Sequence, residues 1–192
     1  THMVIEGDSQ TSTTPDQATN RDAFYSYAYA DDPANAAVTV HVRAQASRTI
    51  GGPAFAGPPV EGPDVGSPTG NTLVDRRGDD MAYGPRLMTA MLGSNDLATF
   101  SVANTMAKWL NYAPTLRAAG IKLAVVAPPP YHPAHAAYAT FNPRWLDYVA
   151  RLRDPAVRAA FADYYGPLGE HPDFRDPATR DTTINTGDFI HL

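Results

Sequence analysis

Short apolar runs alternate along this sequence with longer segments of helical spacing, and that alternation limits the chain to a small set of folds. The apolar runs, which are rich in aliphatic and β-branched residues, cover 3–7, 38–42, 86–92 and 121–127, with a weaker strand signal at 183–184. The segments with apolar residues on one helical face cover 16–30, 72–82, 141–153 and 155–164. A longer one starts at Thr99 or Ser101 and continues to Ala119, with Gly120 as its stop signal. Alternating strands and helices predict an α/β protein with a parallel sheet, and nearly continuous apolar strands are typical of a sheet buried on both faces. We therefore expect a three-layer α/β/α sandwich around a parallel sheet of about five strands.

The composition is that of one soluble globular domain, and it excludes several classes of function. The chain has 192 residues, 43% of them hydrophobic and 18% charged, so we expect a single domain over 1–192 with a sizeable core. Its net charge of −5 gives no basic surface for nucleic acid. It has no cysteine for a disulfide or a thiolate metal site, and no apolar run approaches the about 20 residues of a membrane-spanning helix. Thr1 and His2 have the character of a tag remnant, and the sequence assigns no cellular compartment.

The carboxyl ends of the predicted strands carry most of the residues with chemical potential. In an open parallel sheet these ends meet at one edge, where ligands bind. Polar residues follow five predicted strands there, namely Ser9, Ser47, Asn95, His132, and the pair Asp188 and His191. Their shared position predicts a functional site at this edge of the sheet.

Ser9 is the first candidate for a nucleophile. The first apolar run stops at Gly7-Asp8-Ser9, and a glycine turn at the end of a strand presents the following hydroxyl at the carboxyl edge. The order serine, aspartate, histidine is shared with the α/β-hydrolases, but that fold requires a Gly-x-Ser-x-Gly turn around the nucleophile. No such turn surrounds Ser9, so the α/β-hydrolase fold is not expected.

Three short blocks resemble the conserved blocks of the SGNH (GDSL-type) hydrolases. They are Gly7-Asp8-Ser9, Gly93-Ser94-Asn95-Asp96 and Asp188-Phe189-Ile190-His191, in the family's order and spread over nearly the whole chain. The resemblance implies a flavodoxin-like form of the three-layer sandwich. It also implies an esterase that works without a metal or another cofactor.

The resemblance assigns a catalytic triad to three residues. Ser9 would attack the ester carbonyl, His191 would take its proton and return it to the leaving alkoxide, and Asp188 would orient the histidine ring. The resemblance also implies a final helix after the proposed base, and because the sequence stops at Leu192, one residue after His191, we expect that helix to be absent from it.

The same resemblance assigns an oxyanion hole with three donors. They would be the Ser9 N–H, a backbone N–H after the second strand, and the Asn95 side chain. The second donor matches Ser47, where the family has glycine, and Arg48 and Gly51 are the alternatives.

Other polar residues near these blocks have structural interpretations. Asp96 is expected to be a helix cap or a structural hydrogen-bonding residue. His132 and His135 have a metal-like spacing but no carboxylate cluster nearby, which favours a loop or pocket wall over a metal site. The charges of 75–80 are expected on a solvated helix face.

The substrate class is the least constrained part of the prediction, because Ser-His-Asp acyl transfer serves many esters. The Pro/Gly-rich loop 52–70 and the aromatic segment 131–145 are expected to border the site. Their composition favours a short acyl chain, with an O-acetyl group on a carbohydrate as the preferred ester. Four aromatic residues are candidates for stacking on the sugar, namely Tyr131, Tyr138, Phe141 and Trp145, although the helical spacing of Trp145 favours a position in the core. The alternatives are a lysophospholipase or thioesterase on the same scaffold, and a catalytically inactive ligand-binding module.

Overall fold

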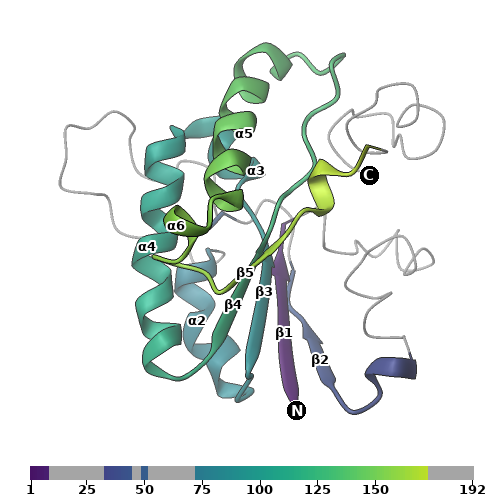
Figure 1. Ribbon diagram of the computed structural model, residues 1–192, viewed down its shortest axis with the longest axis vertical. Coiled ribbons are helices and arrows are strands. Elements are labelled where there is room, and N and C mark those ends of the chain that lie inside the picture. The colour runs from purple at the N-terminus through teal and green to yellow at the C-terminus, as the bar shows by residue number, and fades with distance from the viewer. Residues whose placement is uncertain (9–32, 45–48, 52–71, 173–192) are drawn as a thin grey trace.

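A five-stranded parallel sheet forms the centre of the protein (Figure 1). The computed structural model describes residues 1–8, 33–44, 49–51 and 72–172. The strands are β1 (His2–Gly7), β2 (Thr39–Val42), β3 (Leu87–Met91), β4 (Lys122–Val126) and β5 (Tyr164–Gly166). They adjoin in the order β2-β1-β3-β4-β5, and every adjoining pair is parallel. The prediction of an α/β fold around a five-stranded parallel sheet is therefore confirmed.

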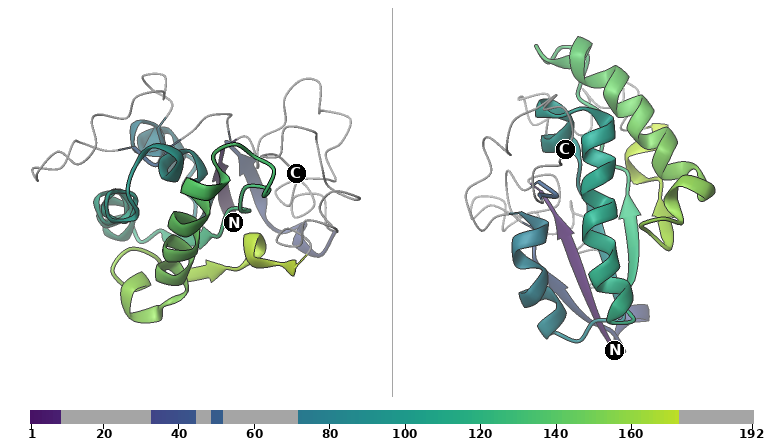
Figure 2. Two further views of the ribbon diagram at one scale, coloured as in Figure 1. Left: turned by 90° about the horizontal axis from the view of Figure 1, so that it is seen from above. Right: turned by 90° about the vertical axis from the view of Figure 1, so that its left-hand side faces the viewer.

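The main helices of the described residues lie on one side of this sheet (Figure 2). They are α2 (Leu73–Ala82), α3 (Ser94–Thr99), α4 (Val102–Ala118), α5 (Tyr138–Arg153) and α6 (Pro155–Arg158), and two short 3₁₀ segments cover Pro33–Asn35 and Leu168–Glu170. From β2 through β3 and β4 to β5 the chain crosses the sheet in one direction, so right-handed crossovers place each connecting helix on the same face. None of these helices has the length and apolar character needed to cross a membrane.

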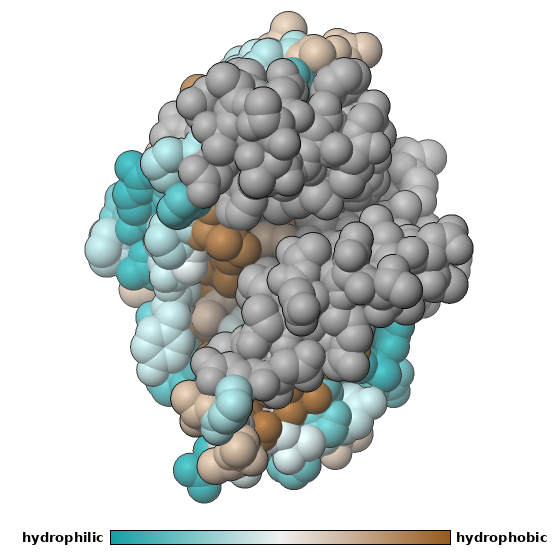
Figure 3. Space-filling view, turned by 90° about the vertical axis from the view of Figure 1, so that its right-hand side faces the viewer, coloured by the Kyte–Doolittle hydropathy of each residue, from teal (hydrophilic) through white to brown (hydrophobic). Residues whose placement is uncertain are grey.

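The opposite side of the sheet has apolar atoms of its own. Figure 3 shows them gathered in the middle of that face, among the described residues. Met3 and Ile5 alternate along β1 with the helix-facing Val4, so they face this opposite side, and both are buried. Residues 9–32 and 173–192 lie outside the described ranges, so the second helical layer stays a prediction.

Local signals in the sequence fix where the longer helices begin and end. Thr72 caps α2, because its hydroxyl accepts a hydrogen bond from the Asp75 N–H at 3.1 Å while the Asp75 carboxylate accepts one from the Thr72 N–H. Ser101 caps α4 by accepting from the Asn104 N–H at 3.2 Å. Gly120 follows the end of α4 with a φ of 72°, a left-handed conformation that favours glycine. Of the two starts that the sequence predicts, Thr99 and Ser101, the structure has the cap at Ser101, and the predicted stop at Gly120 is confirmed.

The core lies between the helices and the face of the sheet that carries Val4. Large aromatic side chains dominate it, and those that are almost fully buried are Trp109, Tyr112, Phe141, Trp145, Tyr148 and Phe161. Burial of each such side chain contributes about 1.5–3 kcal/mol. The expectation that Trp145 packs in the core is confirmed.

The C-terminal part of the described chain differs from the prediction. The helix expected over 155–164 ends at Arg158, and β5 begins at Tyr164. Its three residues pair with β4 at the edge of the sheet, and so short a strand carries no periodic signal. The strand expected at 183–184 lies outside the described residues, and Asp188 and His191 do not directly follow the fifth strand.

The charges of α2 are not all solvated, contrary to expectation. Asp80 is fully buried, and its Oδ1 lies 3.3 Å from the Nε of Arg43, which follows β2. The spacing within one helix did not indicate this pair because the cation comes from another element. The helix also continues through Gly78 without a break.

Candidate active site

The carboxyl ends of β1, β3 and β4 meet at one edge of the sheet, as the parallel pairing requires. Gly7 at the end of β1 pairs with Met91 at the end of β3, so Asp8 and Leu92 leave the sheet at the same level. Asn95 follows within the described residues, half-buried in the first turn of α3. Four other predicted site residues lie outside the described ranges, namely Ser9, Ser47, Asp188 and His191. Their roles stay predictions.

Gly93 lets the chain turn from β3 into α3. Its φ of 122° is open to glycine and strained for other residues. A Cβ at this position would lie 2.8 Å from the ring of Tyr148, closer than any real contact. The glycine that precedes Asn95 is thus required both by its backbone conformation and by a tyrosine on α5.

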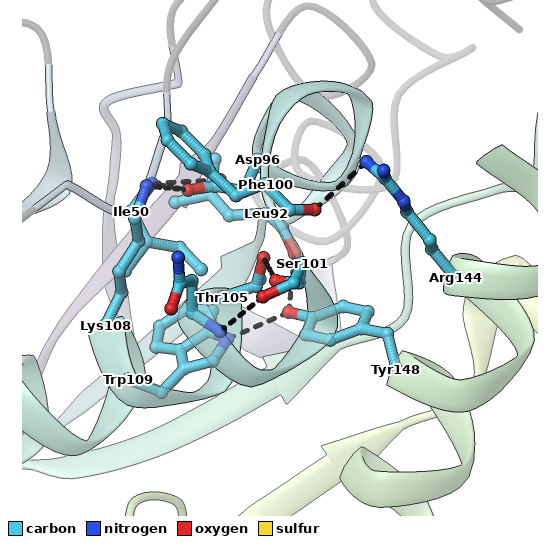
Figure 4. A network of polar contacts seen from close by, with 11 residues as sticks. Ile50, Leu92, Asp96, Phe100, Ser101, Thr105, Lys108, Trp109, Arg144 and Tyr148 are labelled. Atoms are coloured by element: carbon cyan, nitrogen blue, oxygen red, sulfur yellow. Dashed lines mark hydrogen bonds and ion pairs between the residues drawn. The ribbon is translucent and has the colours of Figure 1, made fainter. Parts of the chain in front are cut away.

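Tyr148 holds the end of β3 with its hydroxyl (Figure 4). The hydroxyl donates to the Leu92 carbonyl at 2.9 Å and accepts from the indole N–H of Trp109 at 2.8 Å. Burial raises the pKa of Tyr148 far above its ordinary value, so the phenol keeps its proton and remains a donor. Two helices, α4 and α5, thereby fix the backbone that leads to Asn95.

Asp96 connects this turn to the exit of β2. Its carboxylate is fully buried and accepts from Lys108 Nζ at 2.9 Å and from the Ile50 N–H, with Oδ2 at 3.1 Å. Lys108 is itself buried on α4, and its Nζ lies 3.8 Å from the ring centroid of Phe100. The interpretation of Asp96 as a structural hydrogen-bonding residue is confirmed.

The far end of α3 is held by an arginine from α5. Arg144 donates from one guanidinium nitrogen to the carbonyl of Leu97 at 3.0 Å. The same nitrogen donates to the carbonyl of Phe100 at 3.2 Å (Figure 4). A guanidinium is a suitable partner for the unpaired carbonyls at a helix end. Both ends of the short helix that carries Asn95 are therefore fixed by side chains of the following helices.

Residues 49–51, after β2, are anchored to the start of α2. The carbonyls of Thr49 and Ile50 accept from the first N–H groups of that helix, at 3.0 and 3.1 Å. Gly51 has a φ of 72°, and a Cβ there would overlap the Thr72 side chain at 2.2 Å. Glycine is therefore required at this alternative position for the second oxyanion donor.

The exits of β1 and β4 add a second polar group of residues. Asp8 is buried at the end of β1, and burial together with the charge of Asp8 raises the pKa of Tyr131 after β4. His132 is also buried, and its Nδ1 accepts from the Ala134 N–H at 3.0 Å, which places the proton of the neutral ring on Nε2. Among the residues that the structure describes, no cluster of three histidine or acidic side chains is placed to hold a metal.

Two of the aromatic candidates for sugar stacking, Tyr131 and Phe141, are buried, contrary to expectation. Trp145 is buried as well, in the core position that its helical spacing favours. Tyr131 stacks on Phe141 with ring centroids 3.7 Å apart, and Trp145 donates its indole N–H to the Pro128 carbonyl. The faces of these rings pack in the core, because the largely apolar segment that follows β4 packs against α5. Tyr138 is only partly buried against the same core.

Sequence reasoning did not identify Lys108, Tyr148 and Arg144 as parts of this edge. A signal existed for Lys108, since Thr105, Lys108 and Tyr112 share one helical face and the whole face is buried. A lysine on such a face indicates a buried partner. Tyr148 and Arg144 gave no comparable signal, because their partners are backbone carbonyls of another element.

The fold is that of the GDSL-like lipases and acylhydrolases. A GDSL-like lipase from Parabacteroides merdae aligns with a TM-score of 0.66 over 99% of this chain and 87% of that chain, at 14% identity. An acylhydrolase from Bacteroides fragilis aligns with a TM-score of 0.54 over 98% and 72%, at 15% identity. A GDSL-like lipase from Bacteroides thetaiotaomicron gives 0.52 over 85% and 66%, at 16% identity. The resemblance predicted from the three sequence blocks is confirmed at the level of the fold.

Sequence comparison alone finds no relative. No protein-family model matches the chain, and no curated protein matches its sequence. The likeness to known proteins is therefore carried by the fold.

Proposed function

We propose that this chain is a serine esterase of the SGNH (GDSL-type) family, which hydrolyses a carboxylic ester through an acyl-enzyme intermediate. The observation that carries the proposal is the position of Asn95. It lies in a turn fixed at both ends, directly beyond β3, and β3 pairs with the strand that leads to Ser9. Within the fold of the GDSL-like lipases, this is a suitable place for an oxyanion donor beside a nucleophile.

In the proposed reaction, Ser9 Oγ attacks the ester carbonyl carbon while its proton passes to Nε2 of His191. Asp188 accepts from the other ring nitrogen and stabilises the imidazolium. The C–O bond breaks, and the alkoxide leaves with the proton from His191. Water then attacks the acyl-enzyme by the same route, which releases the acid and restores Ser9.

The negative charge on the carbonyl oxygen requires donors that are fixed before the reaction. The proposed donors are the Ser9 N–H, the N–H at Ser47 and the Asn95 amide, and each such donor contributes about 3–4 kcal/mol to the transition state. The rigid contacts around Gly93 support this role for Asn95, because a preorganised donor needs no rearrangement when the charge develops.

The preferred substrate is an ester with a short acyl chain, such as an O-acetyl group on a carbohydrate. The Pro/Gly-rich composition of loop 52–70 supports a short acyl group, since it offers little apolar surface for a long chain. The burial of Tyr131, Phe141 and Trp145 removes them as sugar-stacking groups, so a carbohydrate would bind through other residues. Hydrolysis of a longer ester or a thioester is the second candidate.

The variant Ser9→Ala tests the proposal directly. Its kcat on p-nitrophenyl acetate should fall by about 10⁴-fold to 10⁶-fold, as for other serine nucleophiles. A matched serine variant, Ser101→Ala, removes the cap of α4 and should keep its activity while losing about 1 kcal/mol of stability. Ester hydrolysis that survives in Ser9→Ala would refute the assignment.

A substrate panel separates the remaining alternatives. Acetyl, butyryl and decanoyl p-nitrophenyl esters, acetylated sugars and acyl-CoA thioesters should be compared by kcat/KM. The proposal predicts the highest value for acetyl esters. If purified protein hydrolysed none of these compounds, a ligand-binding module without catalytic activity would be favoured.

A further inference from the structure

A buried ion pair joins two strand exits at the candidate active site. The carboxylate of Asp96, the third residue of α3, contacts Lys108 Nζ at 2.9 Å. Both of its oxygens also lie within reach of the Ile50 N–H, at 3.1 and 3.4 Å. Asp96 thus belongs to the same turn as Asn95 and at the same time holds the backbone that follows β2 (Figure 4).

The backbone held by Asp96 is close in sequence to the proposed second oxyanion donor. Ile50 is fully buried and comes three residues after Ser47. Its own carbonyl and that of Thr49 accept from the start of α2, so residues 49–50 are held from two directions. The first turn of α2 binds their carbonyls, and the Asp96 carboxylate binds the Ile50 N–H.

Lys108 supplies the charge that keeps this carboxylate in place. Its side chain is 7% exposed and reaches the pair from the middle of α4, with Nζ over the ring of Phe100. A buried carboxylate that loses its cation is strongly destabilised and tends to move toward water. Hydrogen bonds to a charged acceptor are also about twice as strong as those between neutral groups, so the Ile50 contact depends on the same charge.

We infer that Lys108 is a positioning residue of the proposed esterase: by pairing with Asp96 it holds the backbone at Ile50, next to the alternative second oxyanion donor Gly51, in place relative to Asn95. The inference rests on the proposed function. Lys108 does not touch the substrate and takes no part in proton transfer. Its effect reaches the reaction through Asp96 and the Ile50 N–H.

This role has a kinetic signature. Oxyanion donors act mainly in the transition state, so their displacement lowers kcat and leaves KM nearly unchanged. A displacement of about 1 Å costs about a hundredfold in rate. If Lys108 had a merely structural role, its replacement would lower the melting temperature without a selective loss of kcat.

The first experiment compares two lysines that each pair with an aspartate. Lys108→Met should lower kcat on p-nitrophenyl acetate by about tenfold to a hundredfold, with KM within about threefold of the wild type. Lys122→Met is the matched control. Lys122 pairs with Asp163 at 2.8 Å and lies at the start of β4, at the end of the strands away from the candidate site. Its kcat should stay within about twofold. A wild-type kcat for Lys108→Met, with only a lower melting temperature, would overturn the inference.

Two double variants test the route through Ile50 even if Lys108→Met folds poorly. D96N/K108M and D96L/K108M both remove the buried charges, but only asparagine keeps an oxygen that accepts from the Ile50 N–H. The asparagine variant should recover kcat to within about tenfold of the wild type, and the leucine variant should stay about a hundredfold below it. Equal kcat values in the two double variants would overturn the inference.

Ser9→Ala, assayed alongside, separates this inference from the proposed function. If Ser9→Ala is inactive and Lys108→Met has the wild-type kcat, the esterase assignment stands and the role of Lys108 is refuted. If the wild type hydrolyses no ester, the proposed function fails, and the inference fails with it.

Discussion

At the scale of single residues, the absence of a side chain at Gly93 and the position of the Tyr148 ring depend on each other. The space that a side chain at position 93 would need is filled by the phenol ring, and the phenol hydroxyl binds the carbonyl of the preceding residue, Leu92. Neither residue has a chemical role in the proposed reaction. Together they determine where α3 begins and hence where Asn95 lies.

The variant Gly93→Ala measures this pairing. It should lower the free energy of unfolding by about 2–5 kcal/mol, because backbone strain costs about 1–3 kcal/mol and overpacking against Tyr148 costs about as much again. Gly84→Ala is the control, since its φ of 63° is also left-handed but no atom lies within 4 Å of the added Cβ. It should lose only about 1–2 kcal/mol. Equal losses in urea unfolding would contradict the proposed clash.

The variant Asn95→Ala tests the catalytic side of the same turn. Because alanine suits the first turn of a helix, the melting temperature should change little. The kcat should fall by about 10²-fold to 10³-fold through loss of one oxyanion donor. Asn111→Ala, at a half-buried position on α4, is the matched control and should keep the wild-type kcat. An unchanged kcat in Asn95→Ala would exclude Asn95 from the oxyanion hole.

At the scale of elements, the side chain of Asp163 adds to the backbone pairing that attaches the edge strand β5 to β4. Asp163, just before the strand, accepts from Lys122 Nζ at 2.8 Å and from the Leu123 N–H at 3.0 Å, both at the start of β4. Burial alone would raise the pKa of Asp163, but these two hydrogen bonds, together with the charges of Lys122 and Arg117, outweigh it and lower that pKa. A three-residue strand has few ladder bonds, so this contact matters for its register.

The lowered pKa of Asp163 predicts a pH-dependent effect of Asp163→Asn. A carboxyl whose pKa is lower in the folded state stabilises the protein above its unfolded pKa of about 3.9. That contribution is lost as the pH falls through the folded value. Asp163→Asn should therefore be less stable than the wild type at pH 7, and the difference should shrink in acid.

Asp147→Asn provides the control for this measurement by urea unfolding. Asp147 pairs with Arg151 on the exposed surface of α5, and such pairs contribute about 0.3–0.5 kcal/mol. A constant difference between Asp163→Asn and the wild type across the pH range would contradict the assignment.

The elements that could be predicted from the sequence are those with strong local signals. Four strands and the longer helices were found within a few residues, because nearly continuous apolar runs and helix caps are local features. β5 was missed, since a three-residue strand at the edge has no period. The Asn95 turn and the structural role of Asp96 were predicted, but the partner of Asp96 was not. A buried lysine on another helix can be recognised only once the tertiary arrangement is known.

At the scale of the whole molecule, the contacts that fix the described part of the candidate site come from the helices on one face of the sheet. The turn with Asn95 is held by α4 and α5, and the segment after β2 is held by α2 and Asp96. All of these helices cover the same face of the sheet (Figure 2). The packing that stabilises this face also sets the geometry of the described part of the site.

The central place of β1 has a consequence for how the chain is made. β1 lies between β2 and β3, and Met3 pairs with Leu87. At a translation rate of roughly 5–20 residues per second, β3 leaves the ribosome roughly 4–17 s after β1. During that interval the apolar strand that precedes Ser9 has one free edge. Chaperone demand should therefore be greatest before β3 is synthesised, and the sheet and its carboxyl edge should assemble in the same late step.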